Sequence, residues 1–347
     1  MGPPVFRRCF QAIALIATHS LLASGALASG ALAPRDNPGA GFAAGTAASS
    51  RYPAWRAAAA QALSAHGDAG SLATAAALRY LLPARYKGDS AAVRAAAVDL
   101  AAKASDLDPD NAAIGWLRLQ LCAGTAGCDI RDPATTMRWV DADNSAVWMA
   151  TLAVAQRDKD SEEVSRILQE MAQGSRFEVY RNRTVVLLFD TLKHAEAELP
   201  AGYVPSDLSR LSEAMAVAAA EIVPPFTPLL AACRESYGGE RRENCLKLAK
   251  LMQRADTVSA QMAGLTIEKR LSPPDSKDAR AVAERRRELE WRVTAASEYD
   301  APALPWLTNA LARDRVREMR KLSREEDVDI AILRRHKIAL EPPESSQ

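Results

Sequence analysis

Apolar residues recur through most of the chain at intervals of three and four positions. Ile114, Leu117 and Leu121 follow this spacing, which places them on one face of a helix. Regular alternation of apolar and polar residues, typical of sandwiches and barrels, is lacking. The pattern predicts helices over most of residues 51–341 and an all-α fold, built as stacked antiparallel helical hairpins.

Capping residues and prolines mark where these helices begin and end. Asn111, Asn144 and Ser206 each precede an apolar run and can accept hydrogen bonds from first-turn amides. Asp160 with Glu163 has the spacing of a capping box. Residues 184–189 are also apolar enough for a buried strand. The predicted helices are 52–65, 72–82, 90–105, 111–121, 132–139, 144–154, 160–171, 177–199, 206–222, 226–235, 242–254, 257–271, 276–298, 302–322 and 325–336.

One short motif occurs twice. Asp108-Pro109-Asp110-Asn111 recurs 33 positions later as Asp141-Ala142-Asp143-Asn144, and each copy precedes an apolar run with a tryptophan, Trp116 or Trp148. A turn feeding a helix at this period is typical of helical repeats.

On these residues, positions 106–173 resemble tetratricopeptide or related helical-hairpin repeats. Trp148, four residues after Asn144, fits that pattern, whereas Trp116 lies five residues after Asn111 and a cysteine loop interrupts the first unit. The resemblance implies stacked hairpins, whose concave side binds extended peptides in such repeats. The whole layout also resembles secreted helical proteins of bacteria.

The first 28 residues have the features of an export signal. Arg7 and Arg8 precede a mostly apolar stretch, and Ala26-Leu27-Ala28 is a small-x-small cleavage signal. Polar residues dilute the apolar stretch, which disfavours the alternative of a permanent anchor. We expect cleavage near Ala28 and a periplasmic or secreted protein.

The mature chain is predicted to have four segments: a flexible linker (29–50), an N-terminal helical-repeat part (51–199), a C-terminal helical part (200–341) and a disordered tail (342–347). Cleavage removes two arginines and no acidic residue, which changes the formal charge from +1 to −1. This balance disfavours nucleic acid or an anionic membrane surface as the main partner.

Four cysteines remain after cleavage: Cys122, Cys128, Cys233 and Cys245. An even number in an exported protein favours disulfides, although four cysteines allow three pairings. We expect Cys122–Cys128 and Cys233–Cys245, because each pair spans a turn with flexible residues. Zinc is the alternative, but the CxxC pairs and nearby histidines that it prefers are missing.

The sequence has no Walker loop, HExxH, GxSxG, SxxK with its partner motifs, EF-hand loop or dinucleotide fingerprint. His66, His194 and His336 are far apart in the chain, and we interpret each as a surface or capping residue. Paired carboxylates such as Asp141 and Asp143 are explained by their place at helix starts. The sequence thus predicts no catalytic residue, no metal and no cofactor.

Two groups are candidates for partner binding. Trp116, Trp139 and Trp148 belong either to a binding surface or to the contacts between stacked helices. Arg285, Arg286 and Arg287 either recognise an anion or form a solvated helix face paired with neighbouring glutamates.

The leading hypothesis is a non-catalytic exported helical-repeat protein that binds a protein or peptide. The alternatives are a cell-envelope enzyme with a dispersed site and a periplasmic inhibitor or immunity protein.

Overall fold

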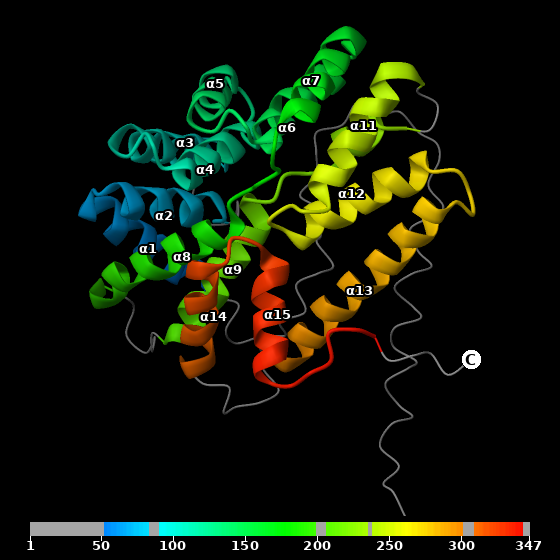
Figure 1. The fold of residues 1–347 in the computed structure, drawn as a ribbon. Coiled ribbons are helices and arrows are strands. Elements are labelled where there is room, and N and C mark those ends of the chain that lie inside the picture. The colour runs from blue at the N-terminus through cyan, green and yellow to red at the C-terminus, as the bar shows by residue number, and fades with distance from the viewer. Residues whose placement is uncertain (1–51, 83–89, 199–205, 235–237, 301–308, 343–347) are drawn as a thin grey trace, which may run out of the picture. The chain divides into compact units, whose positions relative to one another are not determined.

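The parts of the chain that the structure describes are helical. The computed structural model describes residues 52–82, 90–198, 206–234, 238–300 and 309–342. Figure 1 shows coiled ribbons in these ranges, where the one β-type contact is an isolated bridge between Asn144 and Arg176. The predicted all-α class is confirmed. The predicted signal peptide (1–28), the linker (29–50) and nearly all of the tail (342–347) lie outside the described residues.

The helices begin and end near the predicted positions, with η marking 3-10 helices. In chain order they are α1 (Tyr52–His66), α2 (Ala69–Tyr80), α3 (Ser90–Leu107), α4 (Ala112–Ala123), α5 (Arg131–Val140), η1 (Ser145–Trp148), α6 (Met149–Arg157), α7 (Ser161–Gln173), α8 (Arg181–Thr191), η2 (Leu192–Glu198), α9 (Asp207–Glu221), α10 (Thr227–Ala232), α11 (Gly239–Met252), α12 (Val258–Leu271), α13 (Lys277–Asp300), α14 (Asn309–Lys321) and α15 (Glu325–Arg335).

The first three helices pack together through alanine. Alanine is the best helix former, and its small side chain lets neighbouring helices approach closely. Helix α2, which contacts both α1 and α3, has fully buried alanines on most of its turns. A tight corner separates α1 from α2: Gly67 adopts a left-handed φ of 79°, and Asp68 caps α2 by accepting the Ser71 amide. The residues on either side of Gly67 therefore lie close together.

The predicted caps of the two repeated motifs form. The side-chain oxygen of Asn111 accepts the Ile114 amide at 3.4 Å, and that of Asn144 accepts the Ala146 amide at 3.1 Å. The first cap opens α4 directly, whereas the second opens the 3-10 turn η1 before α6.

The predicted capping box of α7 forms only in part. Asp160 accepts the Glu163 amide at 2.9 Å, as the sequence predicts. The Glu163 carboxylate, however, pairs with Arg166 at 2.6 Å. The Glu163 carboxylate therefore binds Arg166, one turn further along the helix, instead of the Asp160 amide that a capping box would give it.

Asn144 is the centre of a buried hydrogen-bond network. Its Nδ2 atom lies 2.9 Å from the Asp141 carboxylate and 2.8 Å from the Glu178 carbonyl. The same atom lies 3.1 Å from the Tyr180 hydroxyl, and Oδ1 accepts the Glu178 amide at 2.9 Å. Asn144 is fully buried. One side chain thus joins the second repeated turn to the segment that precedes α8.

The helix predicted from Phe177 begins instead at Arg181, so the prediction is wrong for its first four residues. Backbone amides there are bound by distant side chains: Asn144 accepts the Glu178 amide, and Asp256 accepts the Val179 amide. Tyr180 then adopts a left-handed φ of 57°. Residues 184–189, apolar enough for a strand, are helical.

Helices distant in sequence also pack together. Helix α1 contacts η2, α2 contacts α8, α7 contacts α11, and α14 contacts both α8 and α9. The main hydrophobic core includes residues from Trp55 to Ile332 and so draws on both predicted parts of the chain. A strict solenoid has contacts mainly between sequence neighbours. The stacked arrangement remains a prediction, and it does not account for these contacts between helices distant in sequence.

None of the helices in the described ranges combines the length and apolar character that a bilayer crossing requires.

Candidate functional site

Trp139 is the most exposed large apolar side chain among the described residues, with 86% of its surface accessible. It lies on α5, whose buried face consists of Pro133, Ala134 and Met137. Two helical positions separate Trp139 from Met137, so the indole points away from the core. Thr135, one turn earlier, is exposed on the same side. The sequence groups Trp139 with Trp116 and Trp148, whereas the structure gives them different exposure: Trp139 is exposed, Trp148 half-buried and Trp116 fully buried.

Trp148 is half-buried in η1 and packs against the main core. Two arginines from neighbouring helices lie over its ring. The guanidinium carbon of Arg138 (α5) is 4.6 Å from the ring centroid, and that of Arg166 (α7) is 5.6 Å away. Both distances are within the range of a cation–π contact. We call Trp139, Trp148, Arg138 and Arg166 the tryptophan–arginine surface.

The two arginines of this surface have different polar partners. Arg166 pairs with Glu163 and Glu170 on its own helix. Arg138 donates to the hydroxyls of Thr135 and Thr151, and no carboxylate of the described residues forms an ion pair with it. Burial, together with the charge of Arg166, lowers the pKa of Arg138. An arginine stays protonated at neutral pH. Arg138 is thus a cation with no carboxylate of the described residues within ion-pair distance, although the nearby charge of Glu163 acts on it.

Trp116 belongs to the core. Its side chain is fully buried in α4, and its indole N–H donates to the carbonyl of Ile222, at the end of α9, at 2.9 Å. Its ring lies 6.1 Å from that of Tyr180. For this tryptophan, the structure supports the alternative of a contact between helices.

The three arginines of α13 are paired with carboxylates. Arg286 pairs with Glu290 at 2.8 Å and Arg287 with Glu284 at 2.6 Å, both within one turn. Arg285 points inward to the buried carboxylate of Glu326 on α15 at 2.6 Å. These pairs resemble the solvated-face alternative, except that Arg285 joins two helices. We therefore place the binding proposal on the tryptophan–arginine surface.

Glu326 receives three arginines, Arg285, Arg292 and Arg324. Burial alone would raise the pKa of this carboxyl, but the hydrogen bonds and charges of the arginines hold it below its usual value. The cluster joins α13 to the start of α15 and has a structural role.

Asp256 is a buried carboxylate that sequence reasoning missed. It lies just before α12, and its oxygens accept the amides of Val179 at 2.9 Å and Arg181 at 3.3 Å. Burial raises the pKa of Asp256 to about 7, and the charges of Glu178 and Glu325 add to this effect. Because its oxygens face backbone amides rather than solvent, Asp256 holds the turn before α8.

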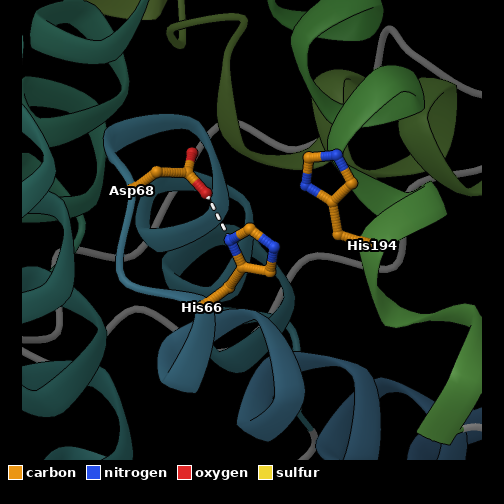
Figure 2. Close-up of side chains that lie close together, drawn as sticks. All are labelled: His66, Asp68 and His194. Atoms are coloured by element: carbon orange, nitrogen blue, oxygen red, sulfur yellow. Dashed lines mark hydrogen bonds and ion pairs between the residues drawn. The ribbon is translucent and has the colours of Figure 1, made fainter.

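His66, Asp68 and His194 form a cluster of exposed side chains (Figure 2). His66 Nδ1 lies 2.9 Å from an oxygen of Asp68, and the imidazoles of His66 and His194 stack with centroids 4.8 Å apart. One possible ligand atom from each residue lies within 4.8 Å of the other two. The interpretation of His66 and His194 as isolated surface residues is therefore incomplete.

The sequence contains a signal for only part of this cluster. His66-Gly67-Asp68 lies at a predicted helix end, where a glycine brings its two neighbours together. Nothing local connects these residues with His194, which reaches them because η2 packs against α1.

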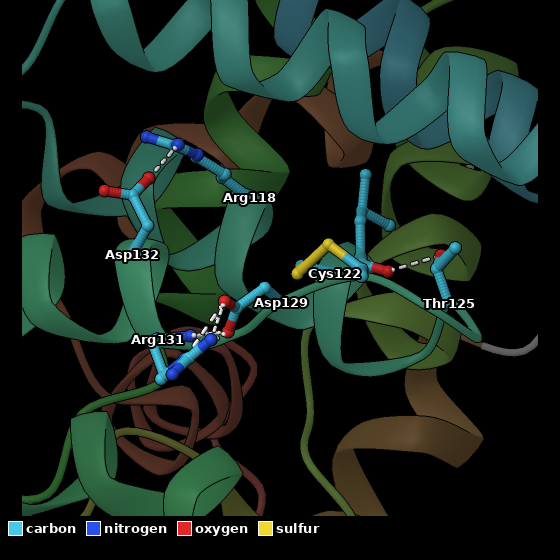
Figure 3. Close-up of a disulfide and its surroundings, with 8 residues drawn as sticks. Arg118, Cys122, Thr125, Asp129, Arg131 and Asp132 are labelled. Atoms are coloured by element: carbon cyan, nitrogen blue, oxygen red, sulfur yellow. Dashed lines mark hydrogen bonds and ion pairs between the residues drawn. A yellow bond between two sulfur atoms is a disulfide. The ribbon is translucent and has the colours of Figure 1, made fainter.

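The structure confirms both predicted cysteine pairs. Cys122, in the last turn of α4, is bonded to Cys128 in the loop before α5 (Figure 3). Beside this bond, Arg118 of α4 pairs with Asp132 of α5 at 2.5 Å. Cys233, after α10, is bonded to Cys245, which is buried on α11. Each disulfide thus restrains the connection between two successive helices.

Replacement of Cys122 and Cys128 by serine is expected to lower the free energy of unfolding by about 2.4 kcal/mol, the loop-closure value for this ring. The corresponding value for the ring between Cys233 and Cys245 is about 2.9 kcal/mol. Urea denaturation of the mature protein measures both. Four reactive thiols in the native, unreduced protein would contradict the pairing.

No protein-family model, curated protein or solved structure matches this chain.

Proposed function

We propose that this chain is a non-catalytic exported helical protein that binds a protein or peptide partner through the tryptophan–arginine surface. The helical-hairpin resemblance of residues 106–173 belongs to the proposal, because α5, η1 and α7 carry this surface within that region.

The observation that carries the proposal is the exposure of Trp139. An indole held in water on the outer face of a short helix contributes nothing to the core of its own chain. Tryptophan and arginine are the residues most enriched among those that dominate binding energy at interfaces. Here Trp139 directly follows Arg138 on α5, and the guanidinium of Arg138 lies over the ring of Trp148.

The charges of this surface suggest the chemistry of the partner. Among the described residues Arg138 hydrogen-bonds only to hydroxyls and lies over the Trp148 ring, whereas Arg166 is already paired with acids. A segment with a carboxylate next to an apolar side chain would place its anion on Arg138 and its apolar group on Trp139. Bidentate pairing between arginine and carboxylate favours this arrangement.

The proposed compartment follows from two independent features. The N-terminal 28 residues have the composition of an export signal. Both disulfides belong to a class of bond that persists in oxidising compartments.

Replacement of Trp139 by alanine is expected to weaken partner binding about 30-fold or more, the effect of losing an interface residue worth about 2 kcal/mol. Immobilised mature protein is exposed to envelope extract from the cells that make it, and the bound proteins are quantified by mass spectrometry. Arg138→Gln should reduce capture of the same protein.

The matched control is Leu208→Ala, since Leu208 is an exposed apolar residue on α9, away from this surface. It should capture the partner as the unchanged protein does. Equal capture by Trp139→Ala and the unchanged protein would overturn the proposal.

A further inference from the structure

Three elements place the cluster of His66, Asp68 and His194. His66 is the last residue of α1, and Asp68 is the N-cap of α2, with only Gly67 between them. His194 comes from the first turn of η2, which packs against α1. The corner between α1 and α2 thus presents an imidazole and a carboxylate to a second imidazole, 128 positions later in the chain (Figure 2).

The donor atoms define a class of ligand. Two imidazole nitrogens and one carboxylate oxygen suit zinc and its neighbours among the divalent transition metals, whereas magnesium and calcium prefer oxygen ligands. Around a tetrahedral ion with bonds of about 2.0 Å, ligand atoms lie about 3.3 Å apart. The present separations of up to 4.8 Å close to that value by side-chain rotation, which exposed side chains can make.

The charges next to the cluster are compatible with a bound cation. One oxygen of Asp68 accepts the Ser71 amide at 2.9 Å, and the other faces His66. Lys193, adjacent to His194, directs its ammonium to Asp190 at 3.3 Å and to the ring of Phe189. Its charge is thus engaged by other groups.

We propose that His66, Asp68 and His194 bind one divalent transition-metal ion of the zinc class, with water completing the coordination. The ion joins the α1–α2 corner to η2, two segments that are remote in sequence. This site is separate from the tryptophan–arginine surface, and its test does not depend on the partner.

The test is titration of the mature, disulfide-bonded protein, without a polyhistidine tag and after treatment with chelator, with zinc chloride in a calorimeter. The unchanged protein should bind one equivalent of zinc and should not bind magnesium at the same concentration. His66→Gln and His194→Gln should each abolish this binding. Cobalt(II) in place of zinc should give the visible absorption of a tetrahedral site, and both variants should lose it.

Asp68→Asn separates metal binding from helix capping, because asparagine caps a helix as well as aspartate does. We expect it to weaken zinc binding by at least the roughly 10- to 100-fold that loss of an outer-shell partner costs, while the circular dichroism spectrum is unchanged. His336→Gln, in the third histidine of the described residues, is the control and should bind zinc as the unchanged protein does.

A second readout is thermal unfolding. Because the ion binds the folded state, zinc should raise the unfolding midpoint of the unchanged protein and of His336→Gln, and should leave that of His194→Gln in place. Absence of saturable zinc binding in the unchanged protein would overturn the proposal. Unreduced affinity in both His66→Gln and His194→Gln would overturn it equally.

Discussion

Replacement of Trp116 by alanine is expected to lower the free energy of unfolding by about 3–5 kcal/mol, the range for a large aromatic residue removed from a core. Trp116 is fully buried in α4, and its N–H bonds to the carbonyl of Ile222. The substitution therefore leaves a cavity and also an unpaired carbonyl at the end of α9. Chemical denaturation followed by circular dichroism measures the loss.

Trp139→Ala is the matched control, since it removes the same side chain from a solvent-facing position. We expect it to change the free energy of unfolding by less than about 0.5 kcal/mol, as is usual for surface substitutions. Equal losses in the free energy of unfolding would contradict the assignment of Trp116 to the core and Trp139 to the surface.

Stability is expected to fall as the pH rises from about 4 to about 7, and Asp256 should cause much of this fall. The pKa of Asp256 is about 7 in the folded protein, against an ordinary value of 3.8 that applies when the chain is unfolded. Because the folded pKa is the higher one, ionisation favours the unfolded chain. The contribution is fully present below pH 3.8 and lost by pH 7, and it amounts to about 4 kcal/mol.

Asp256→Asn has no ionisable group at this position and should flatten the profile between pH 4 and pH 7. Asp329, whose pKa burial raises to about 6, should leave a smaller slope of the same sign. The measurement is urea denaturation at intervals of half a pH unit. Trp116→Phe serves as the control: it should lower stability at every pH without changing the shape of the profile. A profile unchanged by Asp256→Asn would contradict the role of this group.

Helix ends were predictable from local sequence where a single side chain determines them. Asn111, Ser206 and Ser276 each cap the helix that the sequence assigns to them, because a cap needs only an amide three residues later. The cysteine pairs were predictable for a similar reason, since each closes a ring of a few residues around a turn.

The errors arise where a distant side chain determines local structure. No residue from Phe177 to Tyr180 signals a non-helical segment, and the side chains that bind its amides are those of Asn144 and Asp256. The sequence also did not show which tryptophan is buried, because Trp116 and Trp139 both lie in helical runs. Trp116 is buried where α4 packs against the end of α9, whereas Trp139 is exposed.

The candidate sites show the same limit. The sequence identified Trp139 and Trp148 as candidate binding residues. It did not predict the two arginines over the Trp148 ring, because they come from two different helices. His194 reaches His66 only through the contact of η2 with α1. Such contacts depend on the tertiary packing of helices that are distant in sequence, and local sequence patterns do not predict this packing.

The two copies of the repeated turn differ in their tolerance to change. At a partly exposed helix start, Asn111 accepts the Ile114 amide and donates to the Asp108 carboxylate at 2.8 Å. The hydroxyl of serine or threonine can also accept and donate. Position 144 is fully buried and needs an acceptor for two amides together with an NH2 group that faces three oxygens. Among the natural amino acids, only asparagine supplies both functions at that size. The first copy of the motif is thus expected to tolerate substitution of its asparagine better than the second copy.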